Sequence, residues 1–301
     1  MASRTPAKRG GPRLRRVVVA TDFSLEGGRA VRRAATLPLG SRGQVVLIHV
    51  LPAKLDVSVD SVVRGAAEVS LADIAKGMRR MFSARKRNDV TVESKVVKGH
   101  AATEIDRLAL ALSADLVVIG RRGHAPVRDA MLGSTARRLL RHGQYPVLAV
   151  GPAPKAPYKM GVLGFDFSSE ARRAARLLAA VMPPAGKVLA VHTYEDPLKG
   201  LPPALAEHVG EADHKAKLKE RGRLLRRAVD GTSPRASDWQ LRLEAGDPRE
   251  LLLAAVRSKH AEIIAVGPTG KRPLQRTLIG SVAEYVLNRA PCDVLLARRA
   301  V

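Results

Sequence analysis

Two glycine clusters with identical spacing lie in the two halves of this 301-residue sequence. Each has the form Gly-x2-Gly-x9-Gly-Ser, over residues 120–134 and 267–281, and each follows a short apolar run. Glycines after a strand permit positive φ angles and let backbone N–H groups approach a phosphate closely. A Gly-Ser pair that opens a helix adds free N–H groups, a hydroxyl and the positive end of the helix dipole. The spacing therefore predicts a phosphate-binding loop in each half.

These loops differ from two familiar nucleotide motifs. A Walker A loop has Gly-Lys-Ser/Thr at the helix start, and a Rossmann fingerprint has three glycines within six residues after the first strand. Neither pattern occurs at these loops. One Gly-x2-Gly alone would be explained by ordinary turn glycines. Two copies of the same three-part spacing favour ligand binding over that explanation.

The glycine clusters belong to a repeat that covers most of the chain. Val17–Ser24 reappears as Gly161–Ser168, and both segments end in Asp-Phe-Ser. The apolar run that contains His49 reappears with His192. Corresponding residues in the two halves are separated by 143 to 147 positions. Such a small drift over half a chain indicates duplication.

A proline-rich segment divides the two copies. It covers residues 151–157 and is predicted to be a short linker. We therefore predict a basic N-terminal extension over residues 1–13, a first copy over residues 14–151 and a second copy over residues 158–301.

Strands and helices are predicted to alternate within each copy. Strands that are apolar on both faces and alternate with helices are typical of a parallel sheet covered by helices on both sides. Ligands of such sheets bind beyond the carboxyl ends of the strands, where both glycine loops lie. The predicted strands are residues 17–21, 44–50, 90–97, 115–119 and 146–150, then 160–165, 187–192, 239–244, 262–266 and 292–297. The predicted helices of the first copy are residues 24–37, 61–87, 102–112 and 134–142, with Ser24, Ser134 and, in the second copy, Ser168 as N-caps.

Composition limits the class of protein. The sequence is 46% hydrophobic but only 3% aromatic, which favours a Val/Leu sheet covered by Ala/Leu helices. No apolar run approaches the roughly 20 residues of a membrane span, and the run after the basic N-terminus is too short for a signal peptide. The single cysteine, Cys292, excludes an internal disulfide. We therefore expect a cytoplasmic protein without a membrane partner.

The net charge of +24 admits two interpretations. It is spread over both halves, much of it as arginine pairs in predicted helices. A solvated basic surface is favoured over a polyanion-binding face, because nucleic-acid readers interleave aromatic residues with basic ones and this chain scarcely does. Basic charge would still raise the local concentration of an anionic ligand such as ATP.

The repeated glycine pattern resembles the nucleotide-binding signature of the ATP-binding universal stress proteins. The resemblance covers the chain except its first dozen residues and the linker. It implies two tandem five-stranded parallel-sheet α/β domains of the adenine nucleotide alpha hydrolase-like, Rossmann-like kind, with ATP at the carboxyl ends of the strands. Mg²⁺ would accompany the phosphates, with Ser134 or Ser281 as the only candidate ligands. No other metal site is expected, because no His/Cys cluster is present.

The resemblance assigns binding roles to matched positions in the two copies. The acid after the first strand contacts the adenosine part of ATP, the residue after the strand histidine lies against adenine, and the glycine loop holds ribose and phosphates. In the first copy these residues are Asp22, Val50, Gly120, Arg122, Gly123, Gly133, Ser134 and Thr135. In the second copy they are Asp166, Thr193, Gly267, Thr269, Gly270, Gly280, Ser281 and Val282.

The two predicted sites are unequal. Arg121 and Arg122 would place positive charge beside the phosphates, whereas the second copy has Pro268 and Thr269, and proline removes a backbone donor. His49 and His192 are more simply explained as packed strand-end histidines than as bases. No acid–base set recurs in both copies, so no catalytic residue is assigned.

Three functions follow as hypotheses. The first is an ATP-binding regulator of a bacterial stress response that acts on an unidentified protein partner, with slow or absent hydrolysis. The second is a slow ATPase or phosphoryl-transfer enzyme on the same fold. The third is a basic accessory protein that binds nucleic acid. The resemblance also implies pairing of the two copies through their last strands, Val147 to Val150 against Val294 to Ala297, and leaves a homodimer of chains open.

Overall fold

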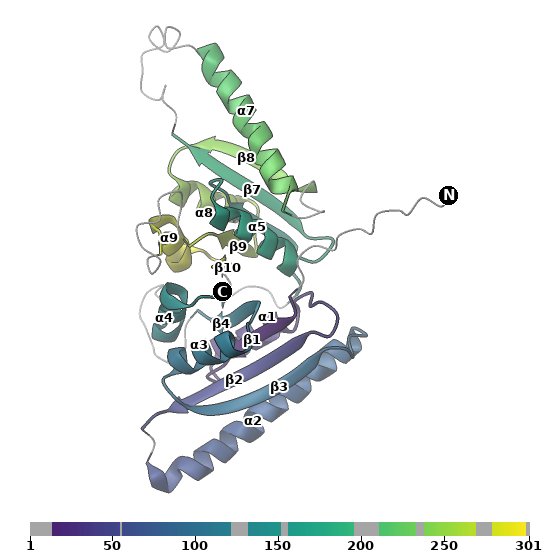
Figure 1. Cartoon of the computed structure of the whole chain (residues 1–301), viewed down its shortest axis with the longest axis vertical. Helices are drawn as coiled ribbons and strands as arrows, with labels where there is room; N and C mark the ends of the chain where they lie inside the picture. The colour runs from purple at the N-terminus through teal and green to yellow at the C-terminus, as the bar shows by residue number, and fades with distance from the viewer. Residues whose placement is uncertain are drawn as a thin grey trace, which may run out of the picture.

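The computed structural model contains one continuous ten-stranded sheet. It describes residues 14–54, 56–121, 132–151, 156–195, 211–232, 238–268 and 279–298. The strand order is β3-β2-β1-β4-β5-β10-β9-β6-β7-β8, so five strands of each copy lie side by side. Figure 1 shows the first copy at the bottom of the view and the second above it. The α/β fold with two tandem parallel-sheet units is therefore confirmed.

The elements follow the predicted order, and the strands agree with the predicted ranges to within two residues. The strands are β1 (Arg16–Ala20), β2 (Gln44–Pro52), β3 (Thr91–Gly99), β4 (Leu116–Gly120), β5 (Val147–Val150), β6 (Met160–Gly164), β7 (Lys187–Tyr194), β8 (Gln240–Ala245), β9 (Ile263–Val266) and β10 (Asp293–Leu296). The helices are α1 (Leu25–Ala34), α2 (Val57–Ala84), α3 (Ala101–Ala111), α4 (Ser134–His142), α5 (Ser169–Val181), α7 (Glu211–Asp230), α8 (Pro248–Ser258) and α9 (Ser281–Arg289). The helix predicted over residues 61–87 begins earlier, because Asp56 caps α2 and accepts from the backbone N–H of Ser58.

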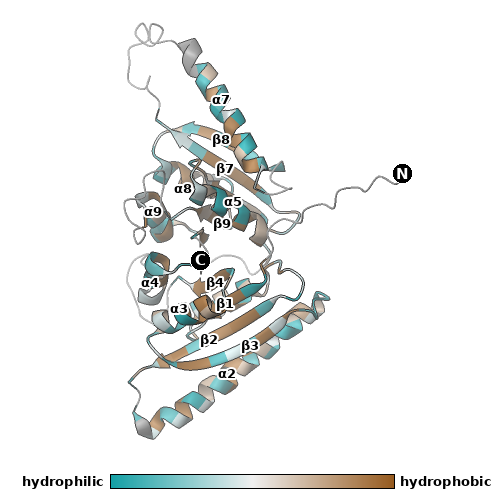
Figure 2. Cartoon of the chain, viewed as in Figure 1, coloured by the Kyte–Doolittle hydropathy of each residue, from teal (hydrophilic) through white to brown (hydrophobic). Residues whose placement is uncertain are grey.

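Helices cover both faces of the sheet, which explains why its central strands are apolar on both sides. One core cluster joins α1, α2 and α5 to one face, and a second joins α3, α4, α8 and α9 to the other. Figure 2 shows the strands as mostly hydrophobic, whereas α2 alternates along its length between hydrophilic and hydrophobic residues. A buried Val/Ile strand between two helix layers is the expected result of this patterning.

The two copies meet at β5 and β10, the one antiparallel pair among the described strands. Val147, Leu148 and Ala149 lie opposite Leu296, Leu295 and Val294. Every other pair in the sheet is parallel. Because Leu148 and Leu295 hold equivalent positions in their copies, an approximate twofold axis passes near this pair. The junction thus converts two five-stranded sheets into one without leaving either final strand as an exposed edge.

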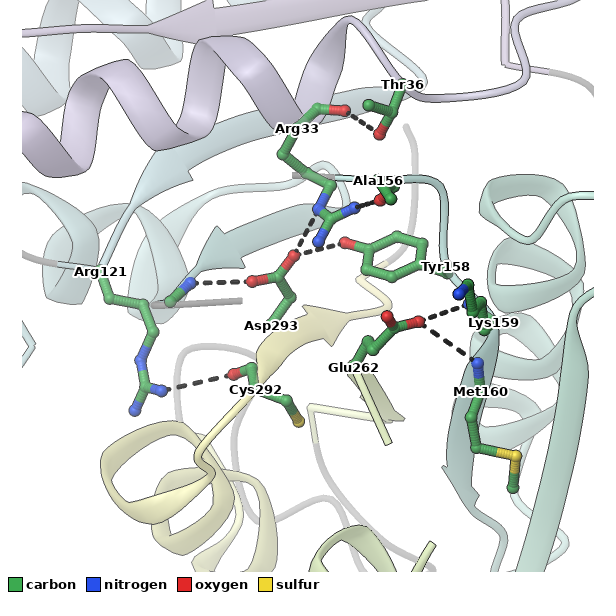
Figure 3. A network of polar contacts seen from close by, with 11 residues as sticks. Arg33, Thr36, Arg121, Ala156, Tyr158, Lys159, Met160, Glu262, Cys292 and Asp293 are labelled. Carbon is green, nitrogen blue, oxygen red and sulfur yellow. Dashed lines mark hydrogen bonds and ion pairs between the residues drawn. The ribbon is translucent and has the colours of Figure 1, made fainter. Parts of the chain in front are cut away.

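A buried polar network stabilises the junction of the two copies on the side of the sheet that α1 covers (Figure 3). The Asp293 carboxylate accepts hydrogen bonds from Arg33 Nε at 2.7 Å, the Tyr158 hydroxyl at 2.6 Å and the Gly151 N–H at 2.9 Å. Arg33 also donates to the carbonyl of Ala156 and lies 4.0 Å from the centre of the Tyr158 ring. The network therefore ties α1, both ends of the linker and β10 to one carboxylate.

The network occurs once and breaks the symmetry of the repeat. Asp293 corresponds to Pro146 in the first copy, and Arg33 corresponds to Leu177 in the second. Asp293 is fully buried and Arg33 is 3% exposed. Burial raises the pKa of Asp293, and Arg33, Tyr158 and Gly151 oppose that rise because each stabilises the carboxylate. Loss of either Arg33 or Asp293 should therefore lower the stability of the fold, because it leaves the other charge buried without its partner.

Removing the carboxylate tests this dependence. We expect Asp293→Ala to lower the free energy of unfolding by about 3–5 kcal/mol, because it leaves the Arg33 charge buried without its partner. The double variant Arg33→Leu/Asp293→Leu removes both charges and should cost clearly less. Urea denaturation followed by circular dichroism measures both changes. A double variant as unstable as the single one would contradict this explanation.

Cys292 supplies a second test, because it lies beside the junction and is 3% exposed. Burial raises the pKa of its thiol to about 12, so at pH 8 the reactive thiolate is depleted on the order of a thousandfold relative to an ordinary cysteine. We expect iodoacetamide to leave the native chain unmodified at pH 8 and to label it once in 6 M urea, as read by intact mass. Rapid labelling of the native chain would show that the junction opens freely.

Candidate functional site

The turn that follows the first strand of each copy is built identically. The Ser24 hydroxyl accepts from the backbone N–H of Gly27 at 3.0 Å and so caps α1. Ser168 caps α5 in the same way, and both N-cap predictions are confirmed. The preceding acids, Asp22 and Asp166, each accept from the N–H and the hydroxyl of the capping serine. The serine thus satisfies the helix end while the carboxylate stays at the edge of the sheet.

The residue between acid and serine adopts a left-handed conformation in both copies. Phe23 has φ 63° and Phe167 has φ 66°, which costs roughly 1–2 kcal/mol for a residue with a Cβ. Each ring packs on the strand histidine, with centroids 4.2 Å apart for Phe23 and His49 and 4.7 Å for Phe167 and His192. These contacts help to hold a backbone turn that the chain would otherwise avoid.

The two histidines anchor this turn. His49 Nδ1 lies 2.9 Å from the carbonyl oxygen of Thr21, and His192 Nδ1 lies 2.7 Å from that of Phe165. A carbonyl can only accept, so Nδ1 bears the hydrogen in both rings. The structure thus places His49 and His192 as packed, hydrogen-bonded strand-end residues, in agreement with the simpler of the two sequence interpretations.

The base of each glycine loop is closed by one backbone hydrogen bond. The N–H of Gly133 donates to the carbonyl of Arg121 at 2.8 Å, and the N–H of Gly280 donates to the carbonyl of Pro268 at 2.6 Å. The residue after the first glycine is therefore joined to the third glycine in both copies. This closure gives a physical reason for the identical separation of the first and third glycines in the two copies.

The helix after each loop begins without a side-chain cap. Gly133 is the N-cap of α4 and Gly280 is the N-cap of α9, and neither helix has a side-chain hydrogen bond at its cap. The prediction that Ser134 is the N-cap is therefore wrong, because Ser134 is the first helical residue. A glycine cap leaves the first N–H groups of the helix available to a ligand, which suits an anion better than a serine cap would.

A cavity of about 260 Å³ opens at the carboxyl ends of the strands in the first copy. It brings together six residues that the sequence singled out: Asp22, Val50, Gly120, Gly133, Ser134 and Thr135. They come from the ends of β1, β2 and β4 and from the start of α4. Arg122 and Gly123 lie outside the described residues, as does His124.

The sequence interpretation missed the remaining wall of the cavity. Thr21 and Gly27 contribute a hydroxyl and a bare helical backbone, and the other residues are apolar: Ala20, Ile48, Ala101, Ile105, Ile119 and Ala136. A Cβ at Gly27 would lie 2.7 Å from Asp22 Oδ1 and 2.8 Å from Thr21 Oγ1. Glycine is unfavourable inside a helix, so the Gly27-Gly28 pair was a signal that could have identified this position.

The second copy places its predicted residues on the equivalent elements. Asp166 follows β6, Thr193 lies in β7, Gly267 follows β9, and Gly280, Ser281 and Val282 begin α9. Thr269 and Gly270 lie outside the described residues, and so do Lys271 and Arg272. The geometry of the turn and of the loop base is therefore shared, whereas the side chains around them differ.

Two residues of the second copy are larger than their counterparts around the cavity of the first. Phe165, which is buried, replaces Thr21, and Ala171 replaces Gly27. Asp166 is half-buried, whereas Asp22 is exposed at the mouth of the cavity. The acid of the first copy is thus the more accessible of the two.

Arg121 has a different role from the predicted one. Its guanidinium crosses the junction and donates to the carbonyl oxygens of Leu287 and Ala290 at the C-terminal end of α9. It also lies 3.4 Å from the carbonyl of Cys292, a contact drawn in Figure 3. A guanidinium satisfies unpaired carbonyls and the negative end of the helix dipole well. The expectation that Arg121 lies beside phosphates is therefore corrected: it holds the two copies together.

Neither a cluster of metal-binding side chains nor a membrane-spanning helix occurs among the described residues. No group of three or more His, Cys, Asp or Glu side chains in them is placed to hold a metal ion. None of the helices in the described ranges is long and apolar enough to cross a bilayer.

Comparison with known proteins gives one family for both copies. The model of the universal stress protein family matches residues 13–151 and again residues 158–298. A universal stress protein of Mycolicibacterium smegmatis is 26% identical over 300 residues, covering 94% of this chain and 96% of the relative. A universal stress protein of Thermus aquaticus is 32% identical over 143 residues, covering 47% of this chain and 99% of its own.

Solved structures agree on the fold of the whole chain. A universal stress protein from Archaeoglobus fulgidus superposes with a TM-score of 0.66 at 18% identity, covering 94% of this chain and 98% of that one. A putative universal stress protein from Pseudomonas aeruginosa gives 0.65 at 19% identity, covering 95% and 93%. With both halves matched by one family model and the whole length matched by relatives of the same architecture, this chain belongs to the universal stress protein family.

Proposed function

We propose that the first copy binds ATP in the 260 Å³ cavity and that the bound nucleotide regulates the protein. The observation that supports this is the convergence of apolar and polar groups in one cavity. Ile48 and Val50 would lie against the adenine base, and the Asp22 carboxylate would accept from the ribose hydroxyls. The uncapped start of α4 at Gly133 and Ser134 would receive the phosphates.

Binding suits this cavity better than turnover. Asp22 is the only titratable side chain in the described lining, and its Oδ1 already accepts from Ser24. General acid–base catalysis needs a positioned donor or acceptor with a suitable pKa beside the reacting phosphate. Ser134 could serve as a ligand to Mg²⁺ carried by the nucleotide. We therefore favour a nucleotide-dependent regulator over a phosphoryl-transfer enzyme.

The second copy would bind nucleotide more weakly or not at all. Phe165 and Ala171 occupy positions where the first copy has a hydroxyl and a bare backbone. Gly267 is crowded as well, since a Cβ there would lie 2.8 Å from Glu170 Cβ. We expect one ATP per chain at concentrations that saturate the first copy.

Matched substitutions of the two acids test this assignment. Asp22→Ala should weaken ATP binding roughly tenfold to a hundredfold, the usual range for losing a hydrogen bond to a charged group. Asp166→Ala, its counterpart in the second copy, should leave the affinity within twofold. Isothermal titration gives affinity and stoichiometry together. Absence of ATP binding by the unmodified chain at high micromolar concentration would refute the proposal, and equal losses in both variants would refute the assignment to the first copy.

Two adjacent glycines of α1 provide a sharper comparison. Gly27→Ala would place a Cβ against Asp22 and Thr21, so we expect about a tenfold loss of ATP affinity. At Gly28 the nearest atom is the flexible end of Arg32, 3.3 Å away. Gly28→Ala should therefore leave ATP affinity unchanged while gaining up to about 1 kcal/mol of stability from helix propensity. If both variants bound ATP as tightly as the unmodified chain, the proposed contribution of Asp22 to ATP binding would be contradicted.

A further inference from the structure

A second cavity lies beside the first, in the groove between α3 and α4. Its volume is about 540 Å³, and Ser134 lines both cavities. Because α3 and α4 both begin at the carboxyl edge of the sheet, the groove runs away from the candidate nucleotide site along the outside of the first copy. Apart from Ser134, no residue of this groove has a part in the proposed nucleotide-binding role.

The groove is strongly basic on its α4 side. Arg137, Arg138, Arg141 and His142 all line it and are all exposed. Residues four apart lie on one helix face, so the four side chains form two rows, 137 with 141 and 138 with 142. Arg137 donates weakly to the carbonyl of Leu132 at 3.3 Å. The groove thus has several exposed cations along a helix of nine residues.

The equivalent helix of the second copy shows that this charge is not required by the fold. At the corresponding positions α9 has Glu284, Tyr285, Asn288 and Arg289. The two helices have the same length, begin at the same glycine-serine pair and cover equivalent strands. One scaffold therefore supports a basic face in one copy and a face without net charge in the other. The fold therefore does not require the basic face of α4.

We propose that the groove between α3 and α4 docks an acidic peptide segment of a partner protein. Arginine side chains bind carboxylates through paired N–H donors. The α3 wall adds the half-buried carboxylate of Asp106 and the hydroxyl of Thr103, which can accept from and donate to a peptide backbone. A mixed wall of this kind fits an extended chain with acidic side chains facing α4.

A nucleic-acid strand fits the same groove less well. No Phe, Tyr or Trp side chain is among the described residues of its lining, so the groove lacks the broad aromatic surfaces on which single-stranded bases usually stack. Asp106 in the wall and Glu284, which pairs with Arg141 at 2.8 Å, would both repel a continuous row of phosphates. These two acids interrupt the positive charge of the groove. A strand with a phosphate at every nucleotide cannot avoid them, whereas a peptide can have its carboxylates at other positions.

Fluorescence polarisation with the full chain tests the proposal. The probe is a fluorescein-labelled twelve-residue peptide with Glu at every second position and Gly or Ser between, at about 0.1 M salt. The groove variant is Arg137→Glu/Arg138→Glu. The control is Lys76→Glu/Arg80→Glu, which makes the same change in net charge at two exposed positions of α2, far from the groove. Circular dichroism checks that both variants remain folded.

We expect micromolar binding by the unmodified chain, a loss of at least tenfold in the groove variant and less than a twofold change in the control. Equal losses in both variants would mean attraction by net charge alone and would overturn the proposal. Absence of peptide binding would also overturn it. So would tighter binding of a single-stranded DNA twelve-mer that is abolished in the groove variant. The test does not depend on ATP, so its failure would leave the nucleotide proposal standing.

Discussion

The antiparallel pairing of β5 with β10 determines how the rest of the chain is arranged. It joins two parallel sheets through their last strands, so the residues beside those strands become interior residues of a larger sheet. Asp293 is fully buried for this reason and requires three donors. Arg121 turns across the same junction to the end of α9. A buried carboxylate and a guanidinium on helix carbonyls are stable only when both copies are docked.

The repeat preserves backbone geometry and varies the side chains around it. The left-handed phenylalanine, the serine cap and the hydrogen bond that closes the glycine loop occur in both copies. These features depend on φ angles and N–H donors, which a duplicated backbone retains. The residues around the cavity depend on volume and polarity instead, and there the first copy has Thr21 and Gly27 where the second has Phe165 and Ala171. Divergence of function within one chain therefore needs few substitutions.

The sequence predicted local features well and long-range side-chain partners poorly. The positions of the strands along the chain and the serine caps at 24 and 168 followed from periodicity and cap chemistry, which operate over a few residues. The same cap rule failed at Ser134, because the glycine before it takes the cap position. Arg121 looked like a phosphate ligand because its sequence neighbours are loop glycines, yet its partners lie more than 160 positions away. Asp293 likewise gave no sign of burial, since its partners come from α1 and the linker.

Contacts with the second copy help to position the candidate site of the first copy. The helix α1 has the Asp22 turn at one end and Arg33 near the other, and Arg33 is fixed to Asp293 of β10. The glycine loop starts at Gly120, and the next residue, Arg121, is fixed to α9. Two walls of the cavity are therefore positioned by contacts across the junction, in a core that does not deform continuously. This gives the second copy a structural role that requires no nucleotide of its own, and it explains how the residues around its equivalent site could diverge while its strands and helices stayed in place.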